Sequence, residues 1–141
     1  MIIRRSTVPT HTRSSPGWGE VSTQALGDAG GLTQFGVSLQ VLQPSAKASV
    51  RHWHAHVDEF LLVVDGEATV TEDDGAHRLL PGDSACWPAG VPNGHTVSNR
   101  STRPCTVLVV GCRLGDTQAV YMDDAEQAAL NAGQAANRAA G

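Results

Sequence analysis

Short apolar segments separated by glycine- and proline-rich turns are the feature of this 141-residue chain that most constrains its fold. From residue 32 onward such segments recur at roughly 8–12-residue spacing, without a long helical pattern between them. The chain has 15 glycines and 7 prolines, and only 17% of its residues are charged, below the roughly 25% of an average globular domain. This pattern predicts an all-β chain, folded as an antiparallel sandwich or barrel.

Three apolar segments are the clearest strand candidates. Residues 32–42 carry Val37, Leu39 and Val41 at alternate positions, which predicts a half-buried strand. Residues 59–64 are almost wholly apolar after their first residue and end at a turn, which predicts a strand buried on both faces. Residues 105–112 form another apolar strand.

A hairpin is predicted around residues 73–76, because strand-like segments at 68–72 and 77–80 flank them and Gly75 can supply a positive φ. Shorter extended segments are expected at residues 49–54, 85–88 and 95–99.

The length fits a single domain with one core. Residues 1–31 are polar and are expected to form an N-terminal arm with one or two short strands. Residues 32–121 are expected to form the barrel. Residues 122–141 are alanine-rich with a weak apolar stripe, and both a short C-terminal helix and a frayed tail fit them.

Charge and cysteine usage limit the partners and the compartment. The net charge is -4 and Lys47 is the only lysine, so we expect no nucleic-acid partner. No apolar run approaches the roughly 18 residues of a membrane helix, and the N-terminus lacks the apolar core of a secretory signal, so no membrane association is expected. Three cysteines without a CxxC pair fit a reducing compartment. The expectation is a cytoplasmic protein.

Histidines supply the candidate site. His52 and His54 are i and i+2, so on a strand they share a face about 6.6 Å apart. Glu59 begins the next strand and can return beside them through a hairpin. With His95 the set offers three imidazole nitrogens and one carboxylate. Such a set suits one divalent transition metal ion (Fe, Mn, Ni, Cu or Zn) and leaves positions open for substrate or water.

These residues carry a resemblance to the cupin superfamily. The stretch 51–66, RHWHAHVDEFLLVVDG, is similar to the first cupin motif, G(X)5HXH(X)4E(X)6G. The stretch 82–99, GDSACWPAGVPNGHTVSN, is similar to the second, G(X)5PXG(X)2H(X)3N. The resemblance implies a small single-domain jelly-roll β-barrel with a metal inside it, commonly a homodimer, and it assigns the metal to His52, His54, Glu59 and His95.

The chain departs from these motifs at two positions. Ala46 stands where the first motif begins with glycine, and His95 follows Gly90 by five residues rather than three. We expect the loop 92–94 to absorb the two additional residues, because the spacing from His95 to Asn99 is intact.

Two classes of function follow from the resemblance. The first is a metal-dependent enzyme acting on a small polar organic substrate, with dioxygenase or other oxidoreductase chemistry favoured over non-redox isomerase, epimerase, decarboxylase or lyase chemistry. Glu59 would then be a ligand or, if it swings away from the metal, a general base. The second is a small-molecule binding or sensing module without catalysis. A barrel that keeps its ligands but has lost its chemistry is a further alternative.

Neighbouring residues receive simpler interpretations. His56 is expected to face solvent or to support the ligands, and Asp58 to point away from Glu59. Asn99 is expected to tie down a turn through side-chain hydrogen bonds. The remaining expectations are an outward Trp53, core positions for Phe35, Phe60 and Trp87, a buried and inert Cys86, opposite faces for Cys105 and Cys112, and surface positions for His11 and His77.

Overall fold

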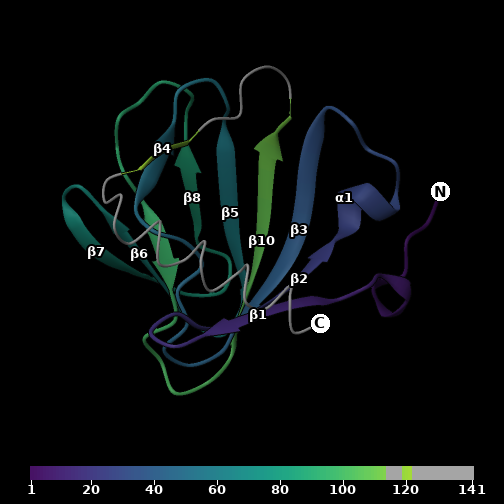
Figure 1. Cartoon of the computed structure of the whole chain (residues 1–141), viewed down its shortest axis with the longest axis horizontal. Coiled ribbons are helices and arrows are strands. Elements are labelled where there is room, and N and C mark those ends of the chain that lie inside the picture. The colour runs from purple at the N-terminus through teal and green to yellow at the C-terminus, as the bar shows by residue number, and fades with distance from the viewer. Residues whose placement is uncertain (114–118, 122–141) are drawn as a thin grey trace.

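A computed structural model describes residues 1–113 and 119–121. The described residues form an antiparallel β structure with one short helix, α1 (Leu26–Ala29), and one 3-10 turn, η1 (Arg5–Thr7). The all-β expectation is confirmed, and the architecture is that of a jelly-roll barrel (Figure 1). None of the helices in this part of the chain is long and apolar enough to cross a membrane.

One wall of the barrel is a six-stranded sheet. Its strands, in spatial order, are β1 (His11–Ser15), β2 (Gly19–Ala25), β3 (Phe35–Leu42), β10 (Cys105–Cys112), β5 (Glu59–Asp65) and β8 (Ser84–Trp87). β1 and β2 therefore extend the edge of this sheet, although they lie in the segment expected to be an arm. All pairings in the sheet are antiparallel.

The other wall consists of two smaller pieces. A three-stranded sheet has the order β7 (Gly75–Leu79), β6 (Ala68–Glu72) and β9 (Thr96–Ser98). A two-stranded piece pairs β4 (His52–His54) with β11 (Ala119–Tyr121). A backbone bridge between His52 and His95 joins the two pieces. The predicted hairpin is confirmed: β6 and β7 pair with Glu72 opposite Gly75, whose φ is +128°.

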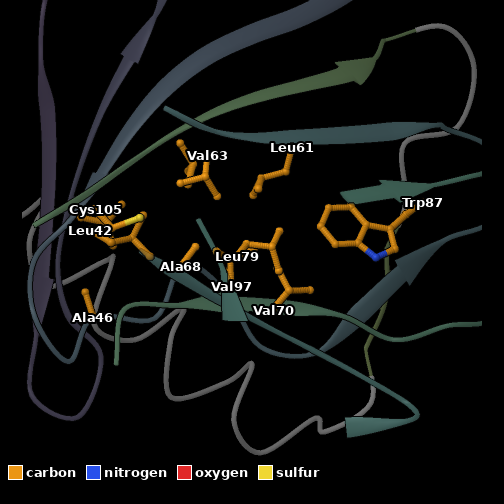
Figure 2. Close-up of a cluster of buried hydrophobic side chains, with 12 residues drawn as sticks. Leu42, Ala46, Leu61, Val63, Ala68, Val70, Leu79, Trp87, Val97 and Cys105 are labelled. Carbon is orange, nitrogen blue, oxygen red and sulfur yellow. The ribbon is translucent and has the colours of Figure 1, made fainter. Parts of the chain in front are cut away.

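The hydrophobic core fills the space between the two walls (Figure 2). Leu61 and Val63 of β5 face Val70 of β6 and Val97 of β9 across this space. Trp87 lies at one end of the core, whereas Leu42, Ala46 and Cys105 close the other end.

The strand at residues 59–64 is not buried on both faces as expected. Leu61 and Val63 are each 1% exposed, but Val64 is 49% exposed. Alternate residues of β5 point to opposite faces, and only one of these faces packs into the barrel. The other belongs to the outer surface of the six-stranded sheet.

Three cysteine thiols are free, and their positions partly differ from expectation. Cys105 is buried and Cys112 is exposed, so the prediction that they occupy opposite faces is confirmed. The prediction of a buried Cys86 is wrong. It lies opposite Phe60 in the β5–β8 pair, one residue out of phase with the inward-facing Trp87, and is therefore exposed on the outer face.

The C-terminal helix or tail expected at residues 122–141 lies outside the described residues.

Candidate metal centre

Two short strands bring the predicted ligands together. His52 and His54 are the first and last residues of β4, and their ring centroids lie 5.0 Å apart. Glu59 begins β5, and the connection between the two strands returns it to the histidines. One nitrogen of each ring and one carboxylate oxygen of Glu59 lie within 4.8 Å of one another.

His95 comes from a distant part of the sequence but joins the same cluster. Its backbone N–H donates to the carbonyl of His52 at 2.9 Å, and the N–H of His52 donates to the carbonyl of His95 at 3.1 Å. The His52 and His95 ring centroids are therefore only 4.9 Å apart. The two additional residues of the second motif lie in the loop before His95 and leave this pairing intact.

The Glu59 carboxylate lies among the rings. Its Oε2 atom is 3.2 Å from Nε2 of His54 and 3.5 Å from Nε2 of His95. Burial alone would raise the pKa of Glu59, but when no cation occupies the group, contacts with protonated His54 and His95 and the charges of protonated His95 and His52 lower this pKa to about 2. The carboxylate is therefore ionised throughout the neutral range, which is the form that binds a metal ion.

Backbone carbonyls orient two of the imidazoles. Nδ1 of His52 lies 2.8 Å from the carbonyl oxygen of Val50, and Nδ1 of His95 lies 3.4 Å from that of Asn93. A carbonyl can only accept, so each Nδ1 carries a proton, and each Nε2 is the ring atom that can bind a metal ion once it is deprotonated. Burial lowers the pKa of His52, which keeps its ring neutral and able to act as a ligand.

His95 gives the most direct test of whether a cation fits this group. The residue is 1% exposed, and within the described part of the chain its Nε2 atom has no solvent contact and no hydrogen bond of good geometry. A buried nitrogen without such a bond is costly unless another group binds it. A cation bound by the three rings and the carboxylate would satisfy it, so these residues fit a transition metal ion.

Trp87 supports His95 in a way that the sequence did not indicate. The indole stacks on the His95 ring with centroids 3.7 Å apart and planes 9° from parallel. Its Nε1 donates to a carboxylate oxygen of Glu72 at 2.7 Å. Trp87 belongs to the core, as expected, but it also holds the position of His95. The register between β5 and β8 could have indicated this role, because Trp87 lies directly opposite Glu59.

A cavity of about 270 Å³ adjoins the group. His54 and Glu59 contribute to its wall, together with Ser38 of β3 and Arg113 just after β10. Such a volume, slightly below the roughly 300 Å³ at which drug-sized ligand sites begin, suits a small molecule.

The other residues considered from the sequence lie outside the cluster. His11, His56 and His77 are exposed, and His77 pairs with Asp74 at 2.7 Å. Asp58 accepts a hydrogen bond from the backbone of Ala89 at 2.8 Å, so it stabilises the neighbouring loop.

Asn99 has the structural role expected of it. It is 1% exposed, and its amide donates to the carbonyls of Leu42 and Arg103, at 2.9 and 2.7 Å. Its side-chain oxygen accepts from the backbone N–H and the hydroxyl of Ser101. These bonds tie the loop after β9 to the end of β3.

The fold and the cluster together define a small jelly-roll barrel with three histidines and a glutamate in its interior. Residues 38–111 match the family described as "Cupin domain", which is more than half of the chain. The chain belongs to the cupin family, and the resemblance of its two motifs is confirmed.

Solved structures give the same result. A sugar phosphate isomerase from a cupin superfamily, from Silicibacter pomeroyi, is 41% identical, with a TM-score of 0.80 over 87% of this chain and 82% of that one. A putative sugar phosphate isomerase from Acidithiobacillus ferrooxidans is 24% identical, with a TM-score of 0.74 over 87% and 93%. The polyketide cyclase RemF from Streptomyces resistomycificus is 18% identical, with a TM-score of 0.74 over 90% and 88%. The last two show the fold alone. No curated protein matches this chain.

Proposed function

We propose that this cupin is a metal-dependent enzyme and that it isomerises a small hydroxylated carbonyl compound by proton transfer. The main support for this proposal is the cluster of His52, His54, Glu59 and His95 beside a cavity that suits a small molecule. The relative from Silicibacter pomeroyi, described as a sugar phosphate isomerase, supports isomerisation over the other chemistries of the fold.

The four clustered residues would hold one divalent metal ion. When bound, such an ion supplies Lewis acidity, which makes a proton next to a coordinated carbonyl easier to remove. Two carboxylates line the cavity among the residues that the structure describes, and of these two Glu59 contacts the histidines, whereas Asp58 accepts the N–H of Ala89. We therefore assign Glu59 to the metal, and to the proton transfer if it moves away from the metal during turnover.

Hydrogen exchange tests this proposal. The metal-loaded protein is incubated in D2O with a panel of aldoses, ketoses and their phosphates, and NMR follows deuterium at the carbon next to the carbonyl. We expect exchange and interconversion with the wild type and with His56→Ala, whose histidine is exposed, and neither with the His52→Ala/His54→Ala double variant. Absence of exchange from the wild type with every compound contradicts the isomerase.

Oxygen chemistry, the first expectation from the sequence, has its own readout. The same ligand set can support O2 activation if the bound metal is Fe, Mn or Cu. O2 uptake by the metal-loaded protein with a β-diketone or catechol panel, without proton exchange on the sugar panel, would replace the isomerase by a dioxygenase. A redox-inert metal together with proton exchange would exclude the dioxygenase.

A homodimer is proposed from the outer surface of the six-stranded sheet. Leu39, Leu62 and Leu108 are aligned across β3, β5 and β10 and share the face opposite the core. Phe35 is 43% exposed and, with Phe60, borders a hollow of about 320 Å³ on this face. The same apolar face on two copies could pair across a two-fold axis, as in an isologous dimer.

Light scattering on a sizing column tests this assembly. We expect twice the 14.8 kDa chain mass for the wild type and a single chain mass for Leu108→Asp. A wild-type monomer at micromolar concentration contradicts the dimer.

The cytoplasm is the proposed compartment, supported by the free state of the three thiols.

A further inference from the structure

We propose that Arg113 binds the negatively charged group, a phosphate or a carboxylate, of the substrate that the metal centre acts on. This inference rests on the proposed function, because it places the anionic end of the substrate at Arg113 in the same cavity. Arg113 is the only lysine or arginine among the described residues that line this cavity.

Arg113 lines the same cavity as two members of the metal centre. It follows the last residue of β10, and its backbone N–H donates to the carbonyl of Gln34 at 3.0 Å. The same cavity is lined by His54 and Glu59. A substrate small enough for about 270 Å³ could therefore contact Arg113 and the histidine cluster at once.

Gly36 makes room for the guanidinium group. A Cβ at this position would lie 3.1 Å from Nε and 3.3 Å from Nη2 of Arg113, so a larger residue would push the group away. This glycine has no positive φ that would explain its presence by backbone conformation. The space it leaves keeps the guanidinium close to the cavity wall.

The hydrogen bonds of Arg113 leave donors for a ligand. Nη2 pairs with the carboxylate of Asp28, and Nη1 makes a long contact of 3.5 Å with the carbonyl of Leu32. A guanidinium has five N–H donors, and no bond from Nε is recorded among the described residues. The side chain is 41% exposed, so an incoming anion can reach it.

The charges that line the cavity favour an anion beside Arg113 over an anion beside Glu59. Asp58 and Glu59, which also line the cavity, repel a carboxylate or a phosphate, whereas Arg113 can pair with either group through two parallel hydrogen bonds. The uncharged, oxygenated part of the substrate would then face the histidine cluster.

Inorganic phosphate and acetate are the binding probes. Calorimetry compares the metal-loaded wild type with Arg113→Gln, Arg113→Lys and a matched control, Arg78→Gln, which removes another exposed arginine paired with a carboxylate, Glu67, outside the cavity. We expect at least tenfold weaker binding of one of the two anions by Arg113→Gln, a smaller loss for Arg113→Lys, and wild-type binding by Arg78→Gln. The anion affected identifies phosphate or carboxylate as the recognised group.

Asp28→Asn separates recognition from support of the loop. It breaks the ion pair but leaves Arg113 in place, so anion binding should persist or tighten. Equal losses in Asp28→Asn and Arg113→Gln, or wild-type affinity for both anions in Arg113→Gln, overturn the inference.

Kinetics distinguish this inference from the isomerase itself. If Arg113→Gln raises KM for a phosphorylated or carboxylated sugar and leaves KM for the uncharged sugar unchanged, the isomerase and the anion-binding role of Arg113 are both supported. If it changes charged and uncharged substrates equally, the inference fails and the isomerase stands. If no sugar is isomerised, the isomerase fails, and the calorimetry with phosphate and acetate still decides the role of Arg113.

Discussion

Trp87 shows how one residue can serve the core and the site together. Its ring closes one end of the barrel core (Figure 2). The same ring stacks on His95. The hydrogen bond to Glu72 fixes the rotation of the indole about its side-chain bonds. Residues that orient ligands in this way affect metal binding without touching the metal.

Replacing this ring should weaken metal binding. We expect Trp87→Leu, which removes the stack, to raise the metal Kd about tenfold, within the range observed for residues that support ligands. Trp87→Phe keeps an aromatic face and should lose less. Metal titrations at a temperature where circular dichroism shows all three proteins folded make the comparison, and equal Kd values would mean that the stack does not position His95.

Cys105 links burial to pH dependence. Burial, together with the charges of Asp65 and Glu67, raises the pKa of its thiol to about 11 from the ordinary value of 9. Between pH 9 and 11 the unfolded chain therefore loses a proton that the folded chain keeps. Because the folded state then binds more protons, its stability falls as pH rises through this window.

Urea unfolding at pH 8 and pH 11 tests this coupling. We expect the wild type to lose about 2–3 kcal/mol more between these two values than Cys105→Ala does. Cys112→Ala, which removes an exposed thiol, is the control and should behave like the wild type. The same pH dependence in wild type and Cys105→Ala would show that the thiol does not carry the effect.

At the scale of the elements, turns fix where each strand ends. Gly66 follows β5 with a φ of +76°, and a Cβ there would lie 2.5 Å from the carbonyl oxygen of Pro104. Gly66, which ends the first motif, is therefore required for two reasons: its positive φ and the close approach of the chain before β10.

Two glycine substitutions separate these requirements. Gly17 has a similar φ of +80° but nothing within 4 Å of a Cβ. We expect Gly17→Ala to cost about 1–2 kcal/mol of unfolding free energy, and Gly66→Ala to cost at least about 1 kcal/mol more, because it adds a steric clash to the backbone strain. Chemical denaturation measures both losses of unfolding free energy. Equal losses would show that the close approach to Pro104 does not contribute to the cost at Gly66.

Much of this arrangement of strands was predictable from local pattern. The boundaries of β10 and the turn between β6 and β7 follow directly from apolar runs and turn residues. The spacing of the motif residues also indicated which side chains meet, since two histidines on one strand face must share a direction.

Orientation within the barrel was not predictable in the same way. On β3 the apolar Val37, Leu39 and Val41 suggest the core face, yet Ser38 and Gln40 are in register with the inward-facing Val109 and Val107. Ser38 of β3 lines the cavity inside the barrel, whereas Leu39 lies on the apolar outer face of the sheet, so alternation alone assigns the wrong face. Cys86 was misplaced for a related reason, because its direction depends on the register with β5.

For the whole molecule, the barrel brings together groups that lie far apart in the chain. His52 and His95 are paired through their backbones, and Arg113, just after β10, lines the same cavity as His54 and Glu59. The jelly-roll topology thus places the candidate metal centre and the proposed anion site in one cavity. The two functions can be tested separately because they use different residues.

Metal content tests the central claim most directly. The chain is purified without a histidine tag, dialysed, and analysed by elemental analysis for Fe, Mn, Ni, Cu and Zn. We expect close to one ion per chain for the wild type and for His56→Ala, and almost none for His52→Ala/His54→Ala. A wild type that holds no metal after purification and dialysis, or a double variant that holds as much as the wild type, would contradict the assignment of His52, His54, Glu59 and His95 as a metal centre.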